Sequence, residues 1–360
     1  MSRTGIITWH NYPNFGSALQ TYALQHFINL KGGDATVINY VPFFKPKLGE
    51  LRYLLSKADP FIPHKISVKL NYRFIEFEKD FIPETESIVS SKGLKDLNNR
   101  FDNFVCGSDQ IWAPNCFNEN YFLSFVDDKK NKVSYAASIG LPYIPDYLKN
   151  QYRFLLSRFN HISLREQQGL TLIEELFGIN GNLVLDPTLL IKKDDWLSIE
   201  KQYKGVDGKY ILCYFLGVNE EHRQYAIKVS KKYNYKIICL SKHQNDYREE
   251  FNTISDAGPM EFINLINNAE VVLTDSFHGV CFSINLEKPF HCFERFKFDD
   301  KVNQNSRIYN ILTLLDLNDR LKRDFQEIED IMLYDINKVN LKLSHLRTVS
   351  EEFLKKSKIL

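Results

Sequence analysis

Residues 5–40 read GIITWHNYPNFGSALQTYALQHFINLKGGDATVINY, and this stretch decides the fold. The apolar run Gly5–Trp9 predicts a short buried strand, which a polar, turn-rich loop follows. Ser17 is then expected to cap a helix whose apolar residues recur at helical spacing. A pair of glycines ends this helix, and Ala35–Tyr40 predicts a second strand. A strand, a helix and a strand within about 36 residues form a βαβ unit, which implies a parallel sheet.

Strand and helix patterns continue to alternate along the rest of the chain. In the first part, short apolar runs are expected to form strands that end at Cys106, Ile139, Leu164 and Leu185. In the second part, strands are expected at 210–216, 236–240, 271–274 and 289–293, and helices at 220–233, 259–268 and 277–286. We therefore expect an α/β fold of two Rossmann-like domains with parallel sheets and a cleft between them. The expected boundaries are residues 1–200, a linker at 201–209, residues 210–325, and a C-terminal helix within 326–360 that begins near Glu327.

The composition excludes several classes of protein. The 360 residues include 46 basic and 45 acidic ones, a net charge of +1, so overall charge does not favour binding to nucleic acid. No apolar run approaches the roughly 20 residues that span a bilayer, and residues 1–5 lack the features of a signal peptide. The six cysteines form no CxxC pair, so we expect most of them to be free core thiols of a cytoplasmic protein. The spacing of histidines and cysteines predicts no metal site, and no coiled-coil seam indicates an oligomer.

Polar residues gather directly after the predicted strands. They form the segments Asn11–Ser17, Gly107–Gln110, Arg165–Glu166, Asp186–Thr188 and Asp275–His278. Ligands of open α/β sheets bind at the carboxyl ends of the strands. The sequence therefore predicts a small-molecule or transferase site built from these segments.

Each of the first two segments has a functional and a structural interpretation. Asn14, Gly16 and Ser17 lead into a helix whose first backbone N–H groups can hold an anion, although a plain capped turn explains them equally well. This loop has neither a GxGxxG nor a P-loop pattern. Asp109, between Ser108 and Gln110, is a candidate general base or hydroxyl-orienting group, and a second helix cap is the alternative.

Arg165 and His278 are the other two candidates for chemistry. The guanidinium fork of Arg165 suits a carboxylate or a phosphate, although an ion pair with Glu166 or another neighbour explains it as well. His278 follows Asp275 and Ser276 and is expected in the first turn of a helix, where the dipole disfavours imidazolium. A neutral histidine there can act as a base or donate a hydrogen bond to a reacting oxygen, whereas a structural histidine is the alternative.

A basic insertion at about 45–73 interrupts the first domain. It contains seven Lys or Arg residues, two acidic residues and interleaved aromatic residues. Such a segment can rest on an anionic membrane surface or bind an anionic acceptor, and a solvated variable loop is the alternative.

Taken together, these motifs resemble those of the polysaccharide pyruvyl transferase family. The matching segments, in the family's order, are Asn14–Gln20 with Tyr22–Leu24, Gly107–Trp112, Ala137–Gly140, Ser163–Glu166, Asp186–Leu190, Thr274–Gly279, Lys288–Phe290 and Asn305–Ile308. They span about residues 5–320 and leave out the region of about 45–69 and the C-terminal helix. The form Ser-Phe-His-Gly around His278 resembles one branch of the family.

The resemblance implies a two-domain fold similar to the GT-B glycosyltransferases. It also implies transfer of pyruvate from phosphoenolpyruvate onto two hydroxyls of one sugar, which gives a cyclic ketal and phosphate, with no cofactor. The acceptor would belong to a surface polysaccharide, such as a capsule or exopolysaccharide, or to its lipid-linked precursor. The enzyme would act in the cytoplasm, with peripheral contact at the membrane face as an option.

The resemblance assigns roles to residues as well. His278 corresponds to the family histidine that contacts phosphoenolpyruvate, and Arg165 corresponds to its anion-holding arginine. Some members have Arg-Leu-His where this chain has Ser276, so Arg307, Lys242 or Arg295 must supply the missing cation, or the donor is held differently. Two other functions stay open: a glycosyltransferase that uses a nucleotide sugar, and a non-catalytic subunit of a glycan assembly complex.

Overall fold

The computed structural model describes residues 2–41, 64–297, 299–300, 302–328 and 330–360. Its first sheet has the strand order β2-β1-β3-β4, and every neighbouring pair is parallel. The strands are β1 (Arg3–Ile7), β2 (Asp34–Val37), β3 (Asn103–Cys106) and β4 (Asn131–Ser134). The short strands β5 (Ser163–Leu164) and β6 (Asn182–Leu183) pair with each other, and a bridge from Ala137 to Leu164 joins them to this sheet.

The second sheet is also parallel, with the order β11-β10-β7-β8-β9. Its strands are β7 (Tyr210–Tyr214), β8 (Lys236–Leu240), β9 (Phe251–Ile254), β10 (Val271–Thr274) and β11 (Phe290–Cys292). This is the order of a Rossmann-type sheet, in which the direction of winding reverses between β7 and β10. In the first sheet the corresponding reversal lies between β1 and β3.

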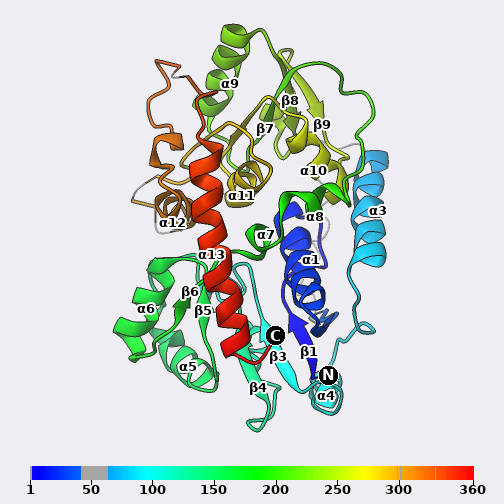
Figure 1. The fold of residues 1–360 in the computed structure, drawn as a ribbon, viewed down its shortest axis with the longest axis vertical. Helices are drawn as coiled ribbons and strands as arrows, with labels where there is room; N and C mark the ends of the chain where they lie inside the picture. Colours follow the sequence, from blue (N-terminus) through cyan, green and yellow to red (C-terminus); the bar gives the residue numbers. More distant parts are fainter. Residues whose placement is uncertain (1, 42–63, 298, 301, 329) are drawn as a thin grey trace.

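Helices connect and cover both sheets. In the first half they are α1 (Phe15–Leu30), α3 (His64–Phe81), α4 (Ser91–Asp96), α5 (Asp146–Leu156), α6 (Gln167–Phe177), α7 (Pro187–Leu190) and α8 (Lys193–Leu197). In the second half they are α9 (Glu220–Tyr233), α10 (Pro259–Asn267), α11 (Phe277–Asn285), α12 (Ser306–Leu314) and α13 (Ile336–Lys356). Figure 1 shows the two sheets one above the other, with α13 running from beside α11 and α12 down to β3 and β4.

The C-terminal half of this helix is fixed to the first half of the chain. Arg347 donates a hydrogen bond from Nε to the carbonyl oxygen of Leu189 at 2.7 Å, and the backbone N–H of Leu185 donates to Oγ of Ser350 at 2.9 Å. Near the C-terminus, Glu351 pairs with Lys31, which follows α1. The C-terminal helix therefore ties the second half of the chain back onto the first sheet.

A continuous hydrophobic core joins the two sheets. One cluster of buried residues contains Ile6 and Leu19 from the first half together with Leu212 from the second. At its centre Phe15, the first residue of α1, stacks on Phe262 of α10 with ring centroids 4.5 Å apart. Aromatic pairs of this kind contribute about 0.5–1.5 kcal/mol beyond the area they bury. The start of α1 is therefore held against the second sheet, and the strand ends of the two sheets meet there.

The structure corrects several expected boundaries. Helix α1 begins at Phe15 and not at Ser17, because Asn14 is the cap: its side chain accepts a hydrogen bond from the Ser17 N–H at 3.2 Å. The C-terminal helix begins at Ile336 and not near Glu327, because Asp335 caps it. Strand β4 ends at Ser134, well before the expected end at Ile139, because Ala136 adopts the left-handed conformation at φ 51°.

Two other features differ from expectation or lie outside it. Strand β9 was not expected. In the basic insertion, residues 64–73 belong to helix α3 and not to a loop, and residues 45–63 lie outside the described residues. All six cysteines are free and five are buried, as expected for core thiols, whereas Cys116 is exposed. The division into domains at 1–200, 210–325 and 326–360 stays a prediction.

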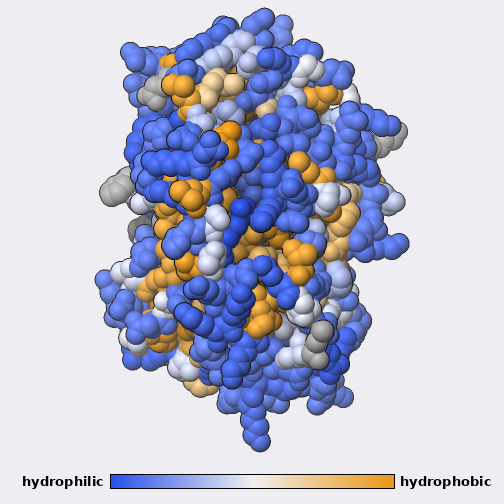
Figure 2. Space-filling model, in the orientation of Figure 1, coloured by the Kyte–Doolittle hydropathy of each residue, from blue (hydrophilic) through white to orange (hydrophobic). Residues whose placement is uncertain are grey.

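Hydrophilic residues cover most of the face seen in Figure 2, and hydrophobic residues reach the surface mainly around its middle. None of the helices in the described ranges is long and apolar enough to cross a membrane.

Candidate active site at the junction of the two sheets

The predicted site residues lie where the winding of each sheet reverses. Asn14 and Ser17 follow β1, and Asp109 follows β3, on either side of the reversal in the first sheet. Ligands of doubly wound α/β proteins bind in the crevice at such points. The second half of the chain contributes His278 to this site, and its ring packs directly against Gly16. A Cβ atom at position 16 would lie only 2.0 Å from Nδ1 of His278. A glycine in the first turn of α1 is therefore required for His278 of α11 to pack there.

Asp109 is the buried anion of the site. Its Oδ2 accepts a hydrogen bond from Oγ of Ser17 at 2.6 Å, and its Oδ1 accepts one from Nη2 of Arg165 at 3.1 Å. Burial opposes ionisation, but the charges of Arg165 and His278 and the Ser17 hydroxyl outweigh it and hold the pKa of Asp109 below its ordinary value. The backbone of Asp109 has φ 71°, a region that non-glycine residues rarely adopt, and such outliers cluster at functional sites.

The side chain of Arg165 is fully buried, and three acidic side chains lie within 4.0 Å of its guanidinium group. Its Nη1 lies 2.7 Å from Oδ2 of Asp186, and its Nη2 donates to Asp109, whereas its Nε is 3.8 Å from Oε2 of Glu166. The guanidinium carbon also lies 4.6 Å from the centroid of the Phe277 ring. The ion-pair interpretation therefore describes Arg165, with Asp186 and Asp109 as its hydrogen-bonded partners and Glu166 as a more distant one. The pKa of Asp186 lies well below its usual range, because His278, Arg165 and Thr188 outweigh the effect of burial.

His278 lies in the first turn of α11, as expected, and faces the same carboxylate. Its Nε2 lies 3.7 Å from Oδ2 of Asp186, too far for a hydrogen bond, and finds no hydrogen-bond partner among the described residues. A buried ring nitrogen without a partner is unusual and is free to meet a ligand. His278 is therefore one of the side chains of this cluster that have an open hydrogen-bonding position.

Asp275 and Ser276 bond to the backbone. Asp275 accepts hydrogen bonds from the N–H groups of Leu216 and Gly217 at 2.6 and 2.9 Å, which ties the loops after β10 and β7 together. Ser276 caps α11 by accepting a hydrogen bond from the N–H of Gly279 at 3.3 Å. These bonds give both side chains a structural role. Their assignment as substrate ligands stays a prediction.

Ser108 and Gln110 flank Asp109. The hydroxyl of Ser108 is completely buried and lies 2.7 Å from the carbonyl oxygen of Ala136 and 3.1 Å from Oδ2 of Asp186. The Nε2 atom of Gln110 is buried and has no hydrogen-bond partner in the part of the chain that the structure describes. Ser108 thus stabilises the Asp186 carboxylate, and Gln110 keeps an unused donor.

Two arginines next to this cluster lack acidic partners. Arg307 is 6% exposed, and its Nη2 donates to Oε1 of Gln304 at 2.9 Å; Nη2 of Arg295 lies 3.5 Å from the same oxygen. Over the described ranges, no carboxylate lies within 4.0 Å of either guanidinium. Burial and the nearby charges of Arg165 and Arg295 lower the pKa of Arg307 to about 9. Arg307 is buried and Arg295 is half-buried. Two cations that share one neutral oxygen repel each other, and an anion between them would relieve this repulsion.

Lys242 lies in a neighbouring cavity that both halves of the chain line. It follows β8, and its Nζ lies 4.9 Å from the centroid of the Phe15 ring. The cavity measures about 150 Å³, with Phe15 and Leu70 from the first half and Lys242, Ile254 and others from the second. Burial lowers the pKa of Lys242 to about 8. The cavity lies one residue along α1 from the point where His278 packs against Gly16.

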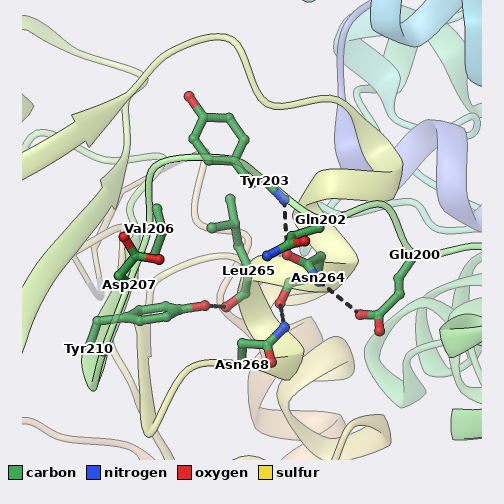
Figure 3. Close-up of a pocket in the computed structure, with 10 residues that line it drawn as sticks. Glu200, Gln202, Tyr203, Val206, Asp207, Tyr210, Asn264, Leu265 and Asn268 are labelled. Carbon is green, nitrogen blue, oxygen red and sulfur yellow. Dashed lines mark hydrogen bonds between the residues drawn. The ribbon is translucent and has the colours of Figure 1, made fainter.

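A more voluminous cavity lies elsewhere. Figure 3 shows this polar cavity of about 590 Å³, lined by the segment 200–210 and by α10. Its polar groups bond largely to one another: Asn264 accepts from the Tyr203 N–H and donates to Glu200, and the Tyr210 hydroxyl donates to the carbonyl of Leu265. None of the predicted site residues lines it, so we do not assign the chemistry to it.

Sequence reasoning missed two members of the site. Asp186 was expected only as part of a strand-end segment, and its pairing with Arg165 depends on the tertiary fold. Tyr12 was not singled out, although its hydroxyl lies 2.7 Å from Oγ of Ser17. Its position in the loop after β1 was the available signal. In the described residues no group of three or more His, Cys, Asp or Glu side chains is arranged to hold a metal ion.

Several solved structures are similar to this chain in fold. The chain is similar to Anabaena Alr3699/HepE in complex with UDP and glucose, with a TM-score of 0.53, 8% identity, and coverage of 98% of this chain and 95% of that one. It is also similar to UDP-GlcNAc 2-epimerase from Neisseria meningitidis bound to UDP-GlcNAc, with a TM-score of 0.51, 10% identity, and coverage of 100% and 95%. At these identities the likeness concerns the fold alone, which is of the GT-B type.

The sequence family is more specific. A family model described as polysaccharide pyruvyl transferase matches residues 14–295, well over half of the chain. The chain therefore belongs to the polysaccharide pyruvyl transferase family and is a transferase. The matched range contains Asn14, Asp109, Arg165 and His278, and Arg307 lies beyond its end. No curated protein matches the sequence significantly.

Proposed function

We propose that this protein transfers pyruvate from phosphoenolpyruvate to two hydroxyl groups of one sugar. The product is a cyclic pyruvate ketal, and phosphate is released. The acceptor is a unit of a surface polysaccharide, such as a capsule or exopolysaccharide, or of its lipid-linked precursor. Family membership supports this reaction, and the observation that carries the choice of donor is the pair of guanidinium groups of the buried Arg307 and the half-buried Arg295, which lack an acidic partner in the described structure.

The donor has two anionic groups, and this site has cations for them. Arg307 and Arg295 would hold the phosphate, which their fork-shaped donors fit. Arg165 is already paired with Asp109 and Asp186, so we expect it to organise these carboxylates and to meet the donor at most through its unpartnered Nε. Some family members carry a cation at the position of Ser276. In this chain Arg307 of α12 and Arg295 of the preceding loop would take its place.

His278 and Asp109 would divide the proton transfers. Carbon 3 of the enol must gain a proton, and the attacking sugar hydroxyl must lose one. Nε2 of His278 is the open position next to the proposed phosphate site, so we assign His278 as the proton donor. Asp109 is ionised and hydrogen-bonded to Ser17, so we assign it to the hydroxyl. Each such group contributes typically ~10²–10⁴-fold to the rate. The proposal requires no metal and no cofactor.

We also propose that the protein acts in the cytoplasm and touches the membrane face through α3, where a lipid-linked acceptor would be found. Val68, Tyr72 and Ile75 are 55%, 65% and 60% exposed and recur at helical spacing. Residues three and four positions apart share one face of a helix, so these side chains form an apolar stripe. Sedimentation with anionic vesicles, compared between the wild type and Tyr72→Ser with Ile75→Ser, tests this contact.

Calorimetry with phosphoenolpyruvate tests the donor. The wild type should bind it at micromolar to millimolar concentrations, and Arg307→Gln should bind about 10- to 150-fold more weakly, because a hydrogen bond to a charged group is worth about 1.5–3 kcal/mol. Arg323→Gln is the matched control, since Arg323 is an exposed arginine that pairs with Glu294. Binding of UDP or GDP without binding of phosphoenolpyruvate would favour a nucleotide-sugar glycosyltransferase. Failure to bind phosphoenolpyruvate, UDP or GDP would favour a non-catalytic subunit.

A further inference from the structure

We propose that Tyr12 is a further catalytic residue, which takes the proton of the acceptor hydroxyl and relays it through Ser17 to Asp109. This inference rests on the proposed function, because it concerns the hydroxyl that attacks the donor. It names the group that the acceptor sugar meets first. Tyr12 lies in the loop between β1 and α1, at the reversal point of the first sheet.

The burial of Asp109 makes a relay necessary. Asp109 is 6% exposed, and Ser17 is completely buried. Oδ2 of Asp109 already accepts from Ser17, while Oδ1 accepts from Arg165 and from the N–H of Gln110. Burial and these three hydrogen bonds together leave little of the carboxylate open to a sugar hydroxyl. Tyr12 is half-buried, and its hydroxyl lies against Ser17 at the edge of this enclosed cluster.

The direction of each hydrogen bond follows from the number of protons available. The ionised Asp109 can only accept, so Ser17 uses its single proton in the 2.6 Å bond to Oδ2. In the 2.7 Å contact between Ser17 Oγ and the Tyr12 hydroxyl, Tyr12 must then be the donor. The Tyr12 oxygen keeps a lone pair, which can accept a proton from an incoming hydroxyl. The chain of bonds is thus oriented from the acceptor toward Asp109.

The relay balances the attack step. As the sugar oxygen forms its bond to carbon 2 of the donor, its proton passes to the Tyr12 oxygen, the Tyr12 proton passes to Ser17, and the Ser17 proton passes to Asp109. Asp109 becomes a neutral acid, and Tyr12 and Ser17 end as neutral hydroxyls. A weakly basic carboxylate suffices, because a hydroxyl bonding to an electron-poor carbon becomes strongly acidic. After the product leaves, the same bonds return the proton to solvent.

This route also agrees with the electrostatics of Tyr12. Burial and the charge of Asp109 both raise the pKa of Tyr12 above its ordinary value. A free-standing tyrosinate is therefore disfavoured at this position. Concerted transfer avoids that species, since Tyr12 gives up one proton while it receives another.

Tyr12→Phe removes the first link and keeps the ring. Phosphate release from phosphoenolpyruvate is measured with a panel of p-nitrophenyl hexopyranosides as diol acceptors, and Tyr147→Phe, which changes an exposed tyrosine on α5, is the matched control. We expect kcat to fall by ~10²–10⁴-fold in Tyr12→Phe while calorimetric binding of phosphoenolpyruvate is retained. In mixtures of H₂O and D₂O, the dependence of kcat on deuterium content should be curved in the wild type and linear in the variant.

The outcomes separate this inference from the proposed function. Failure of the wild type to bind phosphoenolpyruvate contradicts the function itself. Binding and turnover with near-normal kcat and a curved deuterium dependence in Tyr12→Phe would overturn the relay alone. Independently of any acceptor, NMR of ¹³Cζ-tyrosine should show Tyr12 titrating at lower pH in Asp109→Asn than in the wild type. An unchanged titration would show that the two residues are not coupled and would also reject the relay.

Discussion

Gly16→Ala is the substitution whose effect the structure defines most sharply. The added Cβ would lie 2.0 Å from Nδ1 and 2.5 Å from Cε1 of His278, where ordinary contacts begin near 3.4 Å. The imidazole ring or the start of α1 must therefore move by roughly 1.4 Å, the difference between an ordinary contact and the present one. Overpacking of this kind costs about 1–3 kcal/mol. For a chain of this size that corresponds to a fall in Tm of about 1–4 °C.

The effect on activity should exceed the effect on stability. A displacement of about 1 Å at a reacting group can cost ~10²-fold in rate, so kcat for phosphate release should fall by at least that factor while the protein stays folded. Gly93→Ala is the control, because its Cβ would meet only the tip of Ile88 at 3.0 Å and of Ser90 at 3.3 Å, on α4. Calorimetric melting and steady-state kinetics on both variants are the assay. Normal kcat and Tm in Gly16→Ala would refute the assignment of His278 to a fixed position against α1.

Three further predictions follow from the charges of the site. Arg165→Ala should lower the free energy of unfolding by about 3–5 kcal/mol in denaturant melts, because it leaves Asp109 and Asp186 buried without their cation; a loss below 1 kcal/mol would contradict the ion-pair geometry. The pKa values of both carboxyls are depressed in the folded state, so the stability they contribute is present above the unfolded value of about 3.9 and is lost as pH falls through the folded values. The Tm of the wild type should therefore drop more steeply below about pH 4 than that of Asp186→Asn, and parallel curves would reject this linkage. Because the pKa of Lys242 is lowered to about 8, its acetylation rate followed by mass spectrometry should level off near that pH, and an inflection near pH 10 would contradict its burial.

The order of elements could be predicted because periodicity is local. Helix α9 and strand β8 begin and end at the residues that the pattern indicated, since an amphipathic repeat and an apolar run each fit one conformation. Strand β9 was not predicted because its segment lacks a continuous apolar run: Asn252 is exposed and Thr253 is half-buried. Strand β4 was drawn too long because an apolar run does not reveal the turn that Ala136 makes.

The site could be predicted as a set of strand-end segments but not as a bonding pattern. The chemistry of Arg165 and His278 marks them as candidates in any sequence of this kind. Their shared partner, Asp186, is brought to both of them only by the packing of α7 and α11, which local patterns do not encode. The missing acidic partners of Arg307 and Arg295 are likewise a property of the folded chain. The sequence contains nearly as many acidic residues as basic ones, so the composition does not show which arginines lack a partner. Only the folded structure shows which arginines pair with acidic side chains.

The central claim is that pyruvate itself is transferred, and carbon NMR with phosphoenolpyruvate labelled at carbon 2 tests it most directly. The protein is incubated with the labelled donor and the panel of p-nitrophenyl hexopyranosides, and phosphate is assayed in parallel. The account predicts that the enol carbon signal is replaced by that of a ketal carbon, with one phosphate released per ketal, and that His278→Ala slows this by at least ~10²-fold. An unchanged donor signal, with consumption of a UDP-sugar in the same mixture, would contradict it.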